Sequence, residues 1–72
     1  MMYEEAEPDI TVLGELKTAE MPYGKYKGRK LIHLPVHYLE WIARNGFPSG
    51  RLGMLLSTAH IIKTNGLEHL VK

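Results

Sequence analysis

The sequence contains no cysteine, which excludes a disulfide framework and any zinc site built on thiolates. It also lacks long apolar runs, because no stretch approaches the roughly 20 residues that a membrane span requires. With only 72 residues the chain forms one domain at most, and its core must be small. Its stability then has to come from packed helices or from self-association, which leaves a homodimer open.

The N-terminal segment lacks the basic region and following apolar run that an ordinary secretory signal requires. We therefore expect a soluble cytoplasmic protein without membrane contact. Groups for catalysis are scarce too, since residues 21–72 contain only Glu40 and Glu68, whereas two-metal phosphodiester cleavage needs several converging acids. The four histidines have no cysteine or dense carboxylate cluster to complete a tetrahedral site. We expect no enzymatic activity, no metal and no cofactor.

The net charge of +1 hides a separation of charge along the chain. Residues 1–20 hold six acidic residues against Lys17 alone, a net charge of −5. Residues 21–72 hold eight Lys or Arg against two acids, a net charge of +6. An acidic arm beside a basic body favours contact with phosphates, with acidic proteins or with the arm itself. The simpler alternative is an acidic leader that only improves solubility.

The composition divides the chain into an acidic arm, residues 1–19, and a domain, residues 20–72. Within the arm, Ile10 to Leu13 is apolar and partly β-branched, but Gly14 soon interrupts it. This pattern predicts a short edge strand at residues 10–13 or an anchor laid on the body.

Residues 21–34 have the pattern of a β-hairpin. Lys27-Gly28 supplies a residue that can take positive φ, and apolar residues resume at Leu31-Ile32. On an extended ribbon, Lys25 and Lys27 would project to one side and Tyr26 to the other. Cations attract a phosphate backbone, and exposed tyrosines can stack on an unpaired base. The predicted polyanion-binding residues are Tyr23, Lys25, Tyr26, Lys27, Arg29 and Lys30. Alternatively, both tyrosines pack against the helices and the cations are merely solvated.

Two helices are predicted after the hairpin. Pro35 suits the start of the first, which spans Val36 to Asn45 and carries an apolar stripe of Tyr38, Leu39, Ile42 and Trp41. The second begins after Ser49, its expected N-cap, and repeats apolar residues at helical spacing up to Asn65-Gly66. Those residues are Leu52, Leu55, Leu56, Ala59 and Ile62.

Each Asn-Gly pair is expected to end its helix in a left-handed cap, with Phe47 and Leu67 folding back onto the last turn. Leu67 to Val71 is expected to add a final helical turn. Gly53 indicates either a close contact or a helix that begins after it. Trp41 and Phe47 are expected at the centre of the core.

Several separated motifs carry a resemblance to a known family. They are Met21-Pro-Tyr-Gly-Lys-Tyr-Lys-Gly-Arg29, Leu34-Pro35, Tyr38-Leu-Glu-Trp41, Gly46-Phe-Pro48, Gly50, Leu52-Gly53 and Lys63-Thr-Asn-Gly-Leu67. Together they resemble short bacterial proteins labelled putative quorum-sensing-regulated virulence factors, although Phe is more usual at the position of Tyr23. The first and third motifs also resemble the C-terminal module of exodeoxyribonuclease X-like proteins. The resemblance covers roughly residues 20–70 and implies no catalytic residue.

These observations predict a mainly helical α+β protein in which a small β-hairpin packs against two or three helices. The expected function is an accessory or regulatory binding module whose basic hairpin takes nucleic acid or another polyanion, such as an acidic protein. The alternative is a protein-interaction or dimerisation domain. Its contact would use an apolar face of the second helix that involves Leu52, Leu55, Leu56 or Ile62.

Overall fold

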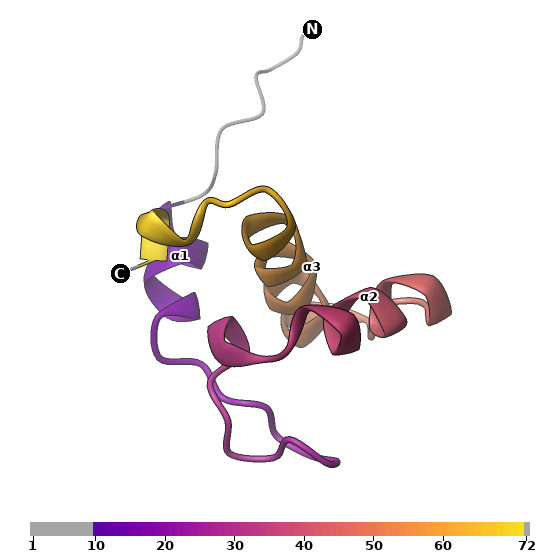
Figure 1. Ribbon diagram of the computed structural model, residues 1–72. Coiled ribbons are helices and arrows are strands. Elements are labelled where there is room, and N and C mark those ends of the chain that lie inside the picture. The colour runs from indigo at the N-terminus through magenta and orange to yellow at the C-terminus, as the bar shows by residue number, and fades with distance from the viewer. Residues whose placement is uncertain (1–9, 72) are drawn as a thin grey trace, which may run out of the picture.

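The computed structural model describes residues 10–71, which form a small helical domain (Figure 1). Along the chain, helix α1 (Ile10–Leu16) precedes a long loop and a single 3-10 turn, η1 (Leu31–His33). Helices α2 (Val36–Asn45) and α3 (Gly50–Thr64) follow, and a second 3-10 turn, η2 (Glu68–Val71), ends the described part. No helix between residues 10 and 71 has the length and apolarity needed to cross a bilayer.

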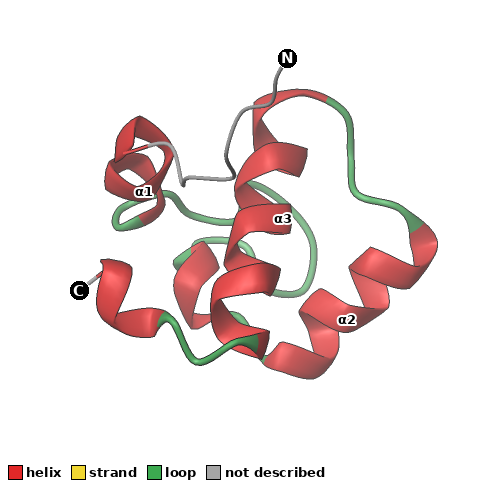
Figure 2. Ribbon diagram, turned by 90° about the horizontal axis from the view of Figure 1, so that it is seen from above, coloured by secondary structure: helices red, strands yellow, loops and turns green. Residues whose placement is uncertain are grey.

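Helix α3 is the central element of the domain. It contacts α1, α2, η1 and η2, and α1 and α2 lie on either side of it (Figure 2). Its side chains at helical spacing are those the sequence predicted for the core, since Leu55, Leu56, Ala59 and Ile62 are all buried. The other buried apolar side chains are Val12, Leu16, Met21, Leu31, Ile32, Leu34, Leu39, Ile42 and Val71.

The two predicted helices are confirmed, with Pro35 and Ser49 at their N-cap positions. Ser49 makes no side-chain capping hydrogen bond. Beyond α3, the N–H of Leu67 donates to the carbonyl of Ile62 at 2.9 Å, and η2 supplies the predicted final helical turn. This bond spans five residues, as in a Schellman motif, and Gly66 has φ 68°, so the left-handed cap predicted at the end of α3 is confirmed. The cap predicted for α2 is wrong in its backbone, because Gly46 has φ 100° and ψ 128°, outside the left-handed helical region.

Residues 10–13 form part of α1, so the strand predicted there is wrong. The β-branched residues favour a strand, but packing of the helix against the core outweighs this local preference. Val12 and Leu16, four residues apart, share one helix face and are buried in the core. The alternative prediction, an anchor on the body, describes this segment. Residues 1–9 of the predicted arm lie outside the described residues.

The structure of residues 20–30 shows that the predicted α+β class and the predicted β-hairpin are both wrong. Among the described residues there is no β-strand, and the one element of β pairing is an isolated antiparallel bridge between Glu20 and Lys30. Gly24 and Gly28 both have positive φ, 82° and 86°, and the chain between them turns instead of extending. Two hydrogen bonds join residues only three apart: Lys27 N–H donates to Gly24 O, and Arg29 N–H donates to Tyr26 O. These backbone groups are therefore not free to pair two strands.

Candidate functional site

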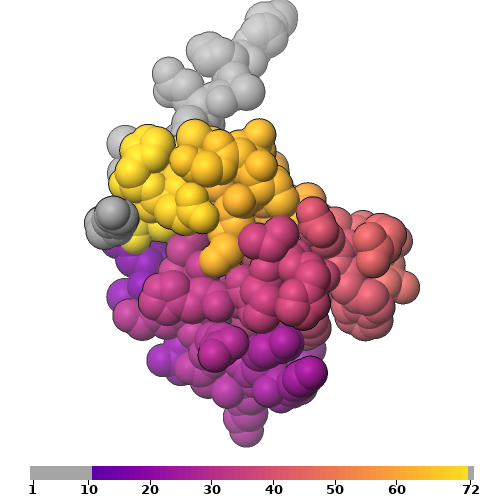
Figure 3. Space-filling view, in the orientation of Figure 1, coloured from indigo at the N-terminus to yellow at the C-terminus, as the bar shows by residue number. Residues whose placement is uncertain are grey.

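Residues 21–30 form a closed loop that carries four cations; we call it the basic loop. At its neck, the N–H of Met21 donates to the carbonyl of Arg29, and the N–H of Gly28 donates to the carbonyl of Met21, both at 2.8 Å. Met21 itself is buried, which fixes the neck to the core. The loop forms a protrusion at the end of the molecule opposite η2 (Figure 3). It therefore presents its side chains to solvent from an anchored base.

The four cations of the basic loop are all exposed: Lys25, Lys27, Arg29 and Lys30. Within residues 10–71 none of them forms an ion pair with a carboxylate. The salt bridge in that part of the chain joins Arg51 of α3 to Glu15 of α1 and includes no residue of the basic loop.

Tyr26 attaches the basic loop to α2. Its ring is half-buried and lies 4.6 Å from the ring of Tyr38, tilted by 59°. The cationic groups of Lys25 and Arg29 lie over the Tyr26 ring, at 5.6 and 5.5 Å from its centroid. The predicted pairing of Lys25 with Lys27 on one side of a ribbon is therefore not observed; Lys25 and Arg29 share the tyrosine instead. Tyr26 thus packs against a helix, as the alternative hypothesis expected of both Tyr23 and Tyr26.

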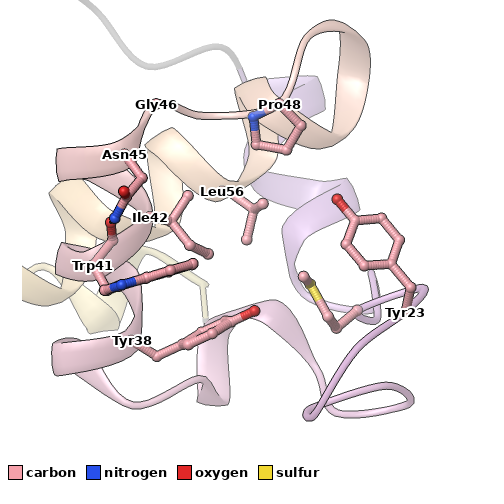
Figure 4. A pocket seen from close by; sticks show the side chains of 9 residues that line it. Tyr23, Tyr38, Trp41, Ile42, Asn45, Gly46, Pro48 and Leu56 are labelled. Atoms are coloured by element: carbon pink, nitrogen blue, oxygen red, sulfur yellow. The ribbon is translucent and has the colours of Figure 1, made fainter.

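Tyr23 behaves differently, because 52% of its surface is exposed. It lines an open groove of about 250 Å³ between the basic loop and α2. Tyr38 and Trp41 of α2 line the same groove, and Figure 4 shows them on the side opposite Tyr23, with Ile42 and Leu56 between. We call this site the aromatic groove; its remaining lining residues are Met21, Asn45, Gly46 and Pro48.

The two rings of α2 in the groove are stacked on each other. The centroids of Tyr38 and Trp41 are 6.2 Å apart and their planes differ by 13°. Trp41 is 54% exposed, so the prediction that it occupies the centre of the core is wrong. Phe47 is partly buried and packs against the core, and its ring lies 6.2 Å from that of His60.

The groove is the feature of this candidate site that the sequence did not reveal. Tyr38 and Trp41 were assigned to the same apolar stripe as Leu39 and Ile42, but only the latter two are buried. A signal was present, because residues three apart share a helix face, and the pairs 38/41 and 39/42 lie on adjacent faces. The basic loop supplies the wall opposite the stacked rings.

The structure also bears on the apolar face of α3 and on the histidines. Leu55, Leu56 and Ile62 are buried in the domain's own core and Leu52 is half-buried, so this face of α3 is not free to bind a partner. The exposed large apolar side chains of α3 are Met54 and Ile61. Within the described residues, no group of three or more His, Asp or Glu side chains is placed to hold a metal ion.

Comparisons with known proteins place the chain among bacterial relatives. The family described as "Putative quorum-sensing-regulated virulence factor" matches residues 9–72. The chain is 52% identical over 59 residues to "Uncharacterized protein YpeB" of Escherichia coli strain K12, a match that covers 81% of this chain and 82% of the relative. The protein of the same description from Escherichia coli O157:H7 matches equally. No solved structure matches the chain.

Proposed function

The chain belongs to the family described as "Putative quorum-sensing-regulated virulence factor", and from that premise we propose that it is a small non-enzymatic binding module for nucleic acid. The observation that carries the proposal is the basic loop. It brings four exposed cations together without a carboxylate partner in the described chain. An accessory or regulatory role follows from binding without catalysis.

Phosphates are the ligand groups that suit this loop best. Lys and Arg side chains on a protruding loop can approach a phosphate backbone, and their binding releases condensed counterions. The cationic groups of Lys25 and Arg29 each lie over the Tyr26 ring, which restricts both side chains and reduces the entropy that they lose on binding. The net charge of +6 on residues 21–72 adds a longer-range attraction.

Two observations favour nucleic acid over other polyanions as the ligand. The aromatic groove opens beside the cations, and nucleic acids combine phosphates with flat bases, whereas acidic proteins do not. The motifs Met21 to Arg29 and Tyr38 to Trp41 also resemble the C-terminal module of exodeoxyribonuclease X-like proteins. A module attached to such an enzyme would lie close to DNA.

A titration of labelled oligonucleotides followed by fluorescence anisotropy tests the proposal. The affinity should fall steeply between about 50 and 200 mM salt, and replacement of Lys25, Lys27 and Arg29 by Ala should weaken binding regardless of base sequence. Lys27→Ala alone should lower the salt slope by about one, because its exposed side chain forms no ion pair within residues 10–71 and removal of one such cation removes one phosphate contact.

Lys17→Ala is the matched control, since it removes the same charge from an exposed position outside the basic loop. It should change the affinity much less than Lys27→Ala. Equal effects of the two substitutions, or binding that does not respond to salt, would refute a nucleic-acid site on the basic loop.

A further inference from the structure

The aromatic groove exposes ring surface that the fold itself does not use. More than half of the Tyr23 and Trp41 surfaces remain exposed, although both residues stand beside buried apolar side chains. Exposed aromatic faces that converge on one depression are typical of binding sites. The question is which class of ligand fits between them.

The walls of the groove are preorganised for a flat ligand. Trp41 lies nearly parallel to Tyr38, and Tyr38 in turn packs against the ring of Tyr26. A three-ring support of this kind holds the Trp41 face in one orientation without help from the ligand. Tyr23 stands across the groove with its ring turned at a steep angle to those of Trp41 and Tyr38, so it can contact the edge of a ligand that lies on Trp41 (Figure 4).

The size and chemistry of the groove also restrict the ligand. Its volume of about 250 Å³ is below the roughly 300 to 1,000 Å³ of pockets that enclose drug-sized ligands. Its floor, Ile42 and Leu56, is apolar and excludes a charged group from the deepest part. At the rim, Asn45 donates through Nδ2 to the carbonyl of Trp41 at 2.8 Å, which leaves its amide oxygen as an acceptor.

We propose that the aromatic groove binds one unpaired nucleic-acid base, stacked on Trp41 with Tyr23 at its edge, while the basic loop holds the phosphates beside it. This inference rests on the proposed function and adds its substrate class: single-stranded nucleic acid. A paired base is stacked inside a duplex and cannot enter the groove. Since every base has a flat face, the site prefers single strands with little regard to sequence.

A matched pair of oligomers separates base recognition from charge. The first is a short oligothymidylate, and the second is an oligomer of abasic residues with the same number of phosphates. The abasic oligomer should bind roughly 5- to 150-fold more weakly, the loss expected when stacking on aromatic side chains is removed. Trp41 is the only tryptophan of the chain, so its fluorescence should be quenched by oligothymidylate and not by the abasic oligomer.

Variants then place the base in the groove. Tyr23→Ala and Trp41→Ala should reduce oligothymidylate affinity toward the abasic level, as measured by anisotropy of a labelled oligomer, and leave abasic affinity unchanged. Trp41→Phe should restore much of the affinity, because it keeps an aromatic face. Met54→Ala truncates an apolar side chain that is 44% exposed outside the groove and should change nothing. Circular dichroism checks that each variant remains folded.

The outcomes distinguish this inference from the function on which it rests. Equal, salt-dependent binding of both oligomers would overturn the base site and leave the nucleic-acid proposal intact. Binding of neither oligomer would refute the proposed function itself. Salt-insensitive binding of an uncharged proline-rich peptide that competes at Trp41 would assign the groove to a peptide ligand and overturn the inference.

Discussion

Gly53 packs so closely against the backbone of Pro48 that no side chain fits between them. A Cβ atom at position 53 would lie 2.8 Å from the carbonyl carbon of Pro48 and closer still to its oxygen. The contact places the turn before α3 directly against the helix, and Pro48 of that turn lines the aromatic groove. A glycine inside a helix is therefore explained by close packing and not by a helix end.

Gly53→Ala should destabilise the protein by more than about 2 kcal/mol, although alanine is the better helix former by about 1 kcal/mol, because the added methyl group clashes with backbone atoms that cannot move aside. Urea denaturation followed by circular dichroism measures the change. Gly14→Ala is the matched control in α1, where open space surrounds the added Cβ, and it should raise stability by up to about 1 kcal/mol. A Gly53→Ala protein as stable as the parent would contradict the close contact.

The two tyrosines of the basic loop should differ in their effect on stability. Tyr26→Ala removes the ring contact with Tyr38 and the support of Lys25 and Arg29, so it should lower the free energy of unfolding by about 2 kcal/mol. Tyr23→Ala should change it by less than about 0.5 kcal/mol, because Tyr23 is 52% exposed. Thermal or urea unfolding measures both.

Tyr26→Phe completes this test. It keeps the ring and removes a hydroxyl group that forms no hydrogen bond within residues 10–71, so its stability should stay within about 0.5 kcal/mol of the parent. Equal losses in Tyr26→Ala and Tyr23→Ala would show that the basic loop is not attached through Tyr26.

The helices could be predicted from the sequence because their information is local. Apolar residues repeat at i, i+3, i+4 and i+7 through α3, and a proline and an Asn-Gly pair mark the ends of α2. Helix α1 was missed because Ile10, Thr11 and Val12 favour a strand and Gly14 interrupts the pattern. Packing of Val12 against the core outweighs that local preference.

The basic loop and the groove depend on contacts that local patterns do not encode. Lys27-Gly28 is compatible with a hairpin turn, but a second positive-φ glycine, Gly24, closes the chain into a loop before strands can pair. All four predicted cations are exposed as expected, whereas the tyrosines have separate roles. The groove forms between Tyr23 and Trp41, eighteen positions later in the chain, and such long-range proximity cannot be inferred from spacing alone.

The ion pair between Arg51 and Glu15 should contribute little to stability. Arg51 Nε donates to Glu15 Oε1 at 2.8 Å, and Nη2 contacts the same oxygen, but the side chains are 46% and 40% exposed. Solvent screening keeps such pairs below about 1 kcal/mol. A double-mutant cycle with Arg51→Ala and Glu15→Ala should give a coupling energy in that range, and it should shrink in high salt. A coupling above about 2 kcal/mol would show that the pair secures α1 to α3.

The acidic residues before α1 should oppose binding of nucleic acid to the basic loop. Residues 1–9 contain four carboxylates and no Lys or Arg, so their deletion raises the net charge from +1 to +5. We expect at least about a twofold gain in oligonucleotide affinity at low salt, and a smaller gain at high salt because the field is screened. Anisotropy titrations of the full and the shortened chain measure the difference.

The last residue that is deleted determines whether the domain stays folded. A deletion of residues 1–17 would also remove Val12 and Leu16, which are buried in the core, and should unfold the domain instead of exposing the basic loop. Circular dichroism of the two deletions therefore separates loss of charge from loss of core. If the chain that lacks residues 1–9 is folded and binds with unchanged affinity, the acidic segment acts only on solubility and does not shield the cations of the basic loop.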